Sequence, residues 1–101
     1  MVEQLRARYR DRALAPDTLF LLNANDAIEF LDEAHSAGLV LAGVEGFLVT
    51  DAGAYQPRQD FSNDMADFEG SGDRFVEETK NLVRQGASVG IRFQIVFEEA
   101  A

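Results

Sequence analysis

The sequence predicts an α+β fold, in which two helices cover one face of a sheet of about four largely antiparallel strands and a third helix precedes them. Three observations support this prediction. Apolar residues recur at helical spacing in two separate segments. β-rich segments lie between and after them, and the last one alternates apolar and polar residues. The order is helix, strand, helix, strand, strand, helix, strand, for which a ferredoxin-like βαββαβ arrangement is the nearest simple topology.

The N-terminal segment predicts a helix over residues 3–15. Val2, Leu5 and Tyr9 recur at helical spacing, and Pro16 prevents a smooth continuation. A short apolar run follows at residues 18–22, between Pro16 and Asn23. Its length and its boundaries favour a buried strand, with an extension of the helix as the alternative.

The next helix is predicted to begin at Asp26 and to end at Gly38. Asp26 and Glu29 have the spacing of a capping box, and glycine is the residue that commonly ends a helix in the left-handed conformation. The apolar face of this helix consists of Ala27, Ile28, Phe30, Leu31 and Ala34.

Two further strands are expected around a turn at residues 51–53. Residues 39–50 are β-rich, and Gly43 and Gly46 indicate a bulge or a bend. Residues 54–61 are expected to return as the antiparallel partner, and Pro57 places this strand at a sheet edge because proline cannot donate to the ladder.

The C-terminal part predicts a helix and a final strand after an acidic loop at residues 62–70. Ser71 is the expected helix cap and Gly86 the expected stop. Residues 90–99 then alternate, with Ile91, Phe93, Ile95 and Phe97 on one face and Arg92, Gln94, Val96 and Glu98 on the other. No repeat and no long linker interrupts the chain, so residues 1–101 are expected to form a single domain.

Acidic residues are concentrated in one region of a chain whose net charge is −9. Between Pro16 and Glu69, eleven acidic residues accompany a single basic one, Arg58. The negative electrostatic field of such a region attracts basic partners and disfavours binding to nucleic acid and to anionic membranes. The arginines of the first helix are expected to form a solvated face that pairs with acids of the same chain.

The composition narrows the chemistry and favours a protein without catalytic activity or a cofactor. The chain has no cysteine, and it contains neither a nucleophile-elbow motif nor a glycine-rich phosphate loop. Its single histidine, His35, is expected near a helix end, where a surface position is the simplest interpretation. The first residues lack the apolar run of a signal peptide, and no stretch is as long and apolar as a membrane span, so a cytoplasmic location is expected.

One segment partly matches a calcium-binding loop. Oxygen ligands at loop positions one, three, five and twelve and a glycine at position six fit the pattern. The ligands would come from Asp67, Glu69, Ser71, Asp73 and Glu78. The alternative is that Ser71 caps a helix whose first turns carry acidic residues.

The acidic loop also suggests a site for a basic protein. Its acids alternate with Phe61, Met65 and Phe68, and apolar anchors surrounded by carboxylates suit such a partner. Alternatively, these apolar residues pack against the core and hold the loop on it. The predicted partner contacts are Glu45, Asp60, Phe61, Asp64, Asp67, Phe68 and Glu69.

Two short motifs, Gly43-Val-Glu-Gly-Phe47 and Asp60-Phe-Ser62, resemble small bacterial immunity proteins of polymorphic toxin systems, most nearly the immunity protein 40 family. The resemblance extends from about residue 26 to residue 98. It implies a non-catalytic protein that binds and neutralises a cognate toxin in the cell that makes it. Two alternatives remain: a calcium- or ligand-binding regulatory module, and a structural homodimer that pairs through the edge near residues 55–61.

Overall fold

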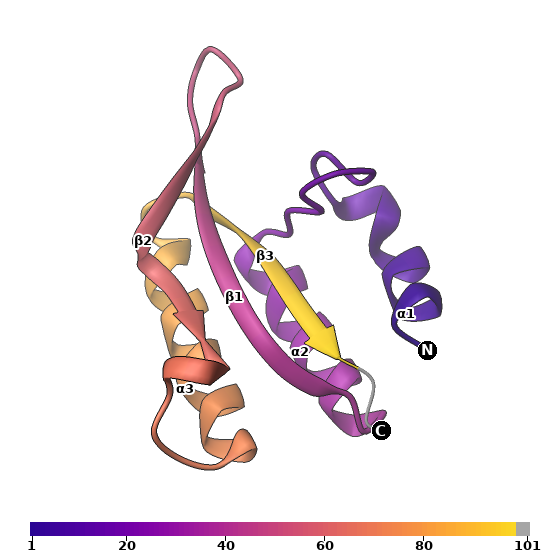
Figure 1. The fold of residues 1–101 in the computed structure, drawn as a ribbon. Coiled ribbons are helices and arrows are strands. Elements are labelled where there is room, and N and C mark those ends of the chain that lie inside the picture. The colour runs from indigo at the N-terminus through magenta and orange to yellow at the C-terminus, as the bar shows by residue number, and fades with distance from the viewer. Residues whose placement is uncertain (99–101) are drawn as a thin grey trace.

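The computed structural model describes residues 1–98 as three α-helices and a three-stranded antiparallel sheet. Helices α2 and α3 lie side by side behind the sheet, and α1 packs beside α2 (Figure 1). The helices are α1 (Val2–Tyr9), α2 (Ala24–Ser36) and α3 (Gly72–Ala87). The strands are β1 (Val40–Val49), β2 (Tyr55–Asp64) and β3 (Ile91–Glu98), and two short 3₁₀ turns are η1 (Arg10–Arg12) and η2 (Met65–Asp67).

The prediction of a fourth strand at residues 18–22 is wrong. Phe20 has a left-handed backbone with φ +55°, which a strand cannot contain. Leu21 therefore pairs with Leu14, and only Leu22 reaches the sheet, in a single bridge to Phe93. The strand order is β2-β1-β3, so the ferredoxin-like arrangement of four strands does not form.

The first two helices differ from their predicted limits. Helix α1 ends at Tyr9 and continues only as the η1 turn, whereas residues 3–15 were expected to be helical. Helix α2 begins at Ala24 because the Asn23 side chain accepts a hydrogen bond from the Asp26 N–H at 2.9 Å. The predicted capping box therefore does not form. Gly38, with φ +82°, follows the helix end as expected.

The C-terminal half follows the predictions more closely. The Ser71 hydroxyl caps α3 by accepting from the Arg74 N–H at 3.2 Å, and the helix ends one residue after Gly86. Strand β2 is longer than expected and takes in the first residues of the predicted acidic loop. In β3, the predicted inward face is buried except for Ile95, which is partly exposed. The final residue of that predicted strand, Glu99, lies outside the described residues.

Strand β2 bows away from β1 at one point. Arg58 pairs with Gly46 and Asn63 pairs with Val44, so that residues 59–62 lie opposite Glu45 alone. A β-carbon on Gly46 would lie 2.6 Å from the Phe61 Cβ and 2.8 Å from its carbonyl oxygen. The predicted irregularity near the glycines of β1 is thus confirmed, and its cause is the close approach of Phe61.

Helix α3 approaches the sheet closely at Gly86. A β-carbon there would lie 2.5 Å from the Phe93 Cζ and 3.1 Å from the Ile91 Cβ. The core around this contact includes Phe75, Val83 and Phe93, which are fully buried. Helix α1 joins the same core through Tyr9, whose ring meets Phe30 edge-on at 5.1 Å.

We expect Gly86→Ala to destabilise the protein. Overpacking against the buried Phe93 ring costs about 1–3 kcal/mol, which outweighs a gain of up to about 1 kcal/mol in helix propensity. The midpoint of urea unfolding should therefore fall with an unchanged m-value.

Gly72→Ala is the matched control, because a β-carbon at that position meets nothing within 4 Å. It should leave the midpoint unchanged or raise it. Equal stability of the two variants would contradict the close approach of α3 to β3.

Candidate protein-binding surface

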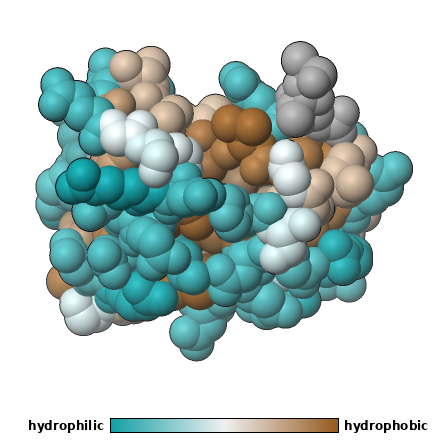
Figure 2. All heavy atoms as spheres, turned by 90° about the horizontal axis from the view of Figure 1, so that it is seen from below, coloured by the Kyte–Doolittle hydropathy of each residue, from teal (hydrophilic) through white to brown (hydrophobic). Residues whose placement is uncertain are grey.

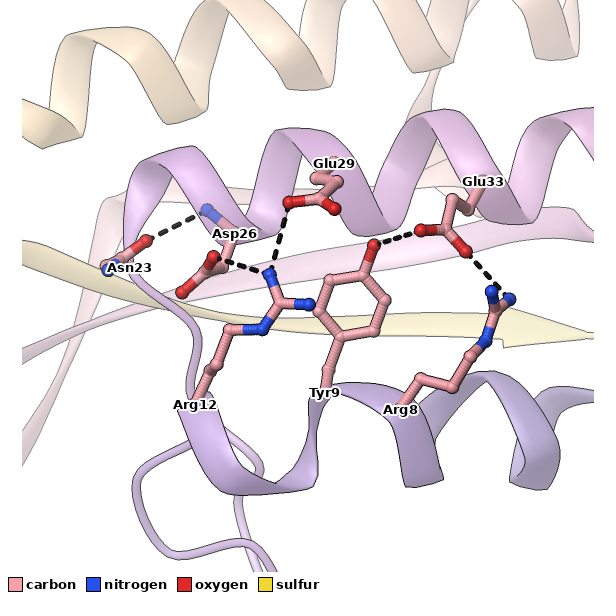
Figure 3. Close-up of polar contacts among 7 residues, drawn as sticks. All are labelled: Arg8, Tyr9, Arg12, Asn23, Asp26, Glu29 and Glu33. Atoms are coloured by element: carbon pink, nitrogen blue, oxygen red, sulfur yellow. Dashed lines mark hydrogen bonds and ion pairs between the residues drawn. The ribbon is translucent and has the colours of Figure 1, made fainter.

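Two arginines of the N-terminal segment form ion pairs with three acids of α2 (Figure 3). Arg8 lies 2.7 Å from Glu33, and one Arg12 nitrogen lies 3.0 Å from Asp26 and 3.1 Å from Glu29. The hydrogen bond to Asp26, with a further one to Glu29, raises the pKa of Arg12. The predicted pairing of this arginine-rich helix with acids of its own chain is therefore confirmed.

Tyr9 reinforces this contact from within the core. Its hydroxyl donates to Glu33 at 2.6 Å while its ring is fully buried. Burial of the phenol raises the pKa of Tyr9, and the hydrogen bond to Glu33 raises it further. The neutral phenol is thus part of the attachment of α1 to α2.

Several other acids also have a basic neighbour. Asp32 binds Lys80 at 2.8 Å, which joins α2 to α3. His35 and Asp73 lie 3.2 Å apart across the same two helices, and they form an ion pair when the imidazole is protonated. Asp60 binds Arg58 at 3.0 Å, and this hydrogen bond lowers the pKa of Asp60.

A shallow groove on the sheet collects acids that have no such neighbour. Glu45 of β1, Asp64 of β2 and Asp67 of η2 line it together with Val44, Gln59, Ser62 and Asn63. A second depression adjoins it, lined by the same Glu45 and Asp64 and by Gln94, Val96 and Glu98. We call the two together the acidic groove. Within residues 1–98, no basic side chain forms an ion pair with any of its four carboxylates.

The bow in β2 builds this groove. At the bow, the Gly46 N–H donates to the Ser62 hydroxyl at 3.3 Å, and that hydroxyl donates to the Arg58 carbonyl at 2.8 Å. The Ser62 side chain therefore replaces a missing ladder bond. The strand then pairs again through Asn63 and Asp64 beside β1, and the Asp64 carboxylate accepts from the Ala66 N–H at 2.9 Å, which starts the turn that carries Asp67.

The predicted contact residues separate into two groups. Glu45, Asp64 and Asp67 come together in the groove, whereas Asp60 pairs with Arg58 and Glu69 does not line the groove. The aromatic members, Phe61 and Phe68, are partly buried and pack against the core. Phe68 also meets the buried Phe75 ring at 5.0 Å. The structure therefore favours the interpretation that the aromatic residues pack against the core and hold the loop on it.

Sequence reasoning missed Gln94, Val96 and Glu98 as members of the groove. The sequence indicated only that these three residues share one face of the final strand, because they alternate with its apolar residues. Only the register, in which Gln94 pairs with Glu45 and Val96 with Gly43, shows that they lie beside β1.

The calcium-loop alternative does not fit this structure. The chain is helical from Gly72 onward, so the second half of the proposed loop cannot wrap around an ion. The Ser71 hydroxyl is engaged as the cap of α3, and Asp73 faces His35. The described residues contain no group of three or more side chains placed to hold a metal ion.

Comparisons with protein-family models, with curated proteins and with solved structures found no match to this chain. Among residues 1–98, no helix has the length and apolar character needed to cross a membrane. The groove is therefore interpreted from its own geometry and charge.

We expect Ser62→Ala to destabilise the protein by about 1–3 kcal/mol, because the partly buried Gly46 N–H loses its acceptor. The measurement is urea unfolding. Ser88→Ala is the control, since its exposed hydroxyl donates only to the Gln85 carbonyl near the end of α3. An equal, small effect of both substitutions would show that Ser62 does not hold the bow.

We expect the folded protein to keep Tyr9 protonated at pH values near 10, where an ordinary tyrosine ionises. Because the folded pKa is raised, the stabilisation is complete below about pH 10 and is lost as the pH rises further, since only the unfolded state then releases the proton. Unfolding free energies between about pH 9 and pH 11.5 should therefore fall more steeply for the natural protein than for Tyr9→Phe. Parallel curves would contradict this expectation.

Proposed function

We propose that this protein is a non-catalytic binding protein whose acidic groove receives a basic surface of a partner protein. One observation carries the proposal: carboxylates from β1, β2, η2 and β3 border one groove and have no basic neighbour among the described residues. Helices α2 and α3 cover one face of the sheet and leave the other uncovered (Figure 1). Gln94, Val96 and Glu98 of the groove alternate with the buried residues of β3, which places them on the uncovered face. A partner with lysine or arginine side chains would supply the missing charges.

Exposed apolar side chains lie in and beside the groove: Val96 lines it, and Val40 pairs with Glu98 of its lining. Val40 and Val96 are 47% and 48% exposed, near the paired ends of β1 and β3. Viewed from below, the surface is largely hydrophilic, with apolar atoms open at its upper edge (Figure 2). Apolar contact supplies affinity, while carboxylates set the encounter rate and the orientation of a basic partner.

The finer proposal is that the partner is a toxin and that this chain is its immunity protein. Support comes from the resemblance of the two motifs at Gly43–Phe47 and Asp60–Ser62, which here meet at the bow of β2. An acidic inhibitor suits a cationic nuclease, because its carboxylates occupy positions where the toxin holds phosphate. On this proposal the protein acts without catalysis, by covering the toxin.

Expression of the adjacent open reading frames tests the toxin proposal. Cells that express the toxic frame should grow only when this protein is present, and a pull-down should retain the complex at low salt and lose it at high salt. If neither adjacent frame is toxic and nothing is retained, the toxin proposal is wrong.

For the groove, we expect a combined Glu45→Gln, Asp64→Asn and Asp67→Asn variant to associate about tenfold more slowly with the partner, because electrostatic steering is lost. Its association rate should also depend less on salt. Stopped-flow or surface-binding kinetics at several ionic strengths measure both effects. The Asp64→Asn change keeps an oxygen that can cap the η2 turn.

The control carries the same number of removed charges elsewhere: Asp11→Asn, Asp51→Asn and Glu78→Gln. These side chains do not line the acidic groove. The control should associate nearly as fast as the natural protein. Equal slowing of both variants would indicate that overall charge, and not the groove, steers the partner.

A further inference from the structure

The outer edge of β3 is occupied at only one position. Leu22 exchanges both backbone hydrogen bonds with Phe93, at 2.9 and 2.8 Å, so the polar groups of Phe93 point away from β1. Alternate residues of an antiparallel strand share this direction, which places the N–H and C=O groups of Ile95 and Phe97 on the same outer edge. No backbone or side-chain partner engages these groups within residues 1–98.

The turn at Phe20 explains why this part of the edge is open. A regular strand continuing back from Leu22 would place residue 20 opposite Ile95 and residue 18 opposite Phe97. The left-handed backbone of Phe20 directs the chain elsewhere, and Leu21 exchanges hydrogen bonds with Leu14 instead. The edge therefore lacks one strand segment at a defined position.

A narrow, partly enclosed groove of about 110 Å³ lies at this position, between α1 and β3. It is lined by Val2, Arg6, Thr18, Phe20, Phe30 and residues 94–97. Most of its lining is apolar, and the Arg6 guanidinium sits over the Phe20 ring at 4.6 Å. No acidic side chain pairs with Arg6 among the described residues.

We propose that this groove binds an extended peptide segment of a partner protein, which adds to β3 as an outer strand. The unpaired groups of Ile95 and Phe97 would bond its backbone, and the partly exposed Ile95 and the exposed Val96 would contact its alternate side chains. Arg6 gives the groove a positive end. The bound segment should therefore contain a carboxylate that lies near Arg6, in addition to apolar residues. This preference is opposite in charge to that of the acidic groove and does not rest on the function proposed for that groove.

A second copy of this chain fits the groove less well. An isologous β3–β3 pairing would bring the second copy's own α1 and its 14–21 loop into the space that α1 already borders. A single extended segment needs no such room. A dimer that forms through this edge without added peptide would overturn the assignment.

Hydrogen exchange in the free protein tests the open edge first. The Ile95 N–H should exchange at least about tenfold faster than the Val96 N–H, which points toward β1. Equal protection of the two amides would overturn the proposal, because it would show that the edge is already paired.

The binding test uses a blocked peptide, Glu-Thr-Val-Thr-Val-Thr, titrated into the ¹⁵N-labelled full chain. The amides of Ile95 and Phe97 should shift and become protected from exchange. Two N-methylated versions of the peptide, modified on alternate residues, provide the control. Strand addition requires that one version loses binding and the other keeps it, because only one set of N–H groups faces β3. Equal binding of both versions, or no binding at millimolar peptide, would overturn the proposal.

Charge reversal on the peptide tests the role of Arg6. Replacing its glutamate by lysine should weaken binding about two- to fivefold. Arg6→Gln should remove this difference, whereas Arg84→Gln on the exposed face of α3 should preserve it. A difference that survives Arg6→Gln would overturn the assignment of the carboxylate to Arg6.

Discussion

The close approach of Phe61 to β1 is the constraint on which the arrangement of this molecule depends. The Cβ and the carbonyl oxygen of Phe61 fit because Gly46 carries no β-carbon, which would lie 2.6 and 2.8 Å from them. This approach accounts for the bow of β2, and the bow sets the position at which Asp64 rejoins β1. A core packing requirement thus determines where the acidic groove forms, although none of its four carboxylates contributes to that packing.

Whether an acidic residue of this chain keeps its negative charge unneutralised depends on its ion-pair partners in the fold and not on its region of the sequence. The acids of α2 belong to the stretch that gives the sequence its acidic character, yet Arg8 and Arg12 neutralise most of them (Figure 3). The same contacts attach α1 through Tyr9. The carboxylates of the acidic groove have no such partner among the described residues, and they lie on the face of the sheet that the helices leave uncovered. Net charge alone therefore says little about which surface attracts a partner.

Local signals in the sequence were sufficient to predict that three helices form, that Ser71 caps the last one and that the central strand is irregular, because caps, periodicity and glycines act over a few residues. They were insufficient where a distant residue decides the outcome. The left-handed backbone of Phe20 turns the chain, so that Leu21 bonds to Leu14 and not to the sheet. Arg12 pairs with Asp26, and Asn23 caps the helix in its place. The groove was partly predictable from its acids, but Glu98 joins Glu45 only through a register that no spacing rule supplies.

The bow of β2 has a consequence for the protein at high concentration. An exposed edge strand with a regular row of backbone groups is a template on which further chains can stack and aggregate. In β2, Pro57 lacks a donor, and the irregular stretch from Gln59 to Ser62 interrupts the row. The feature that shapes the groove therefore also protects this edge from fibre-like growth, so the same few residues of β2 determine both.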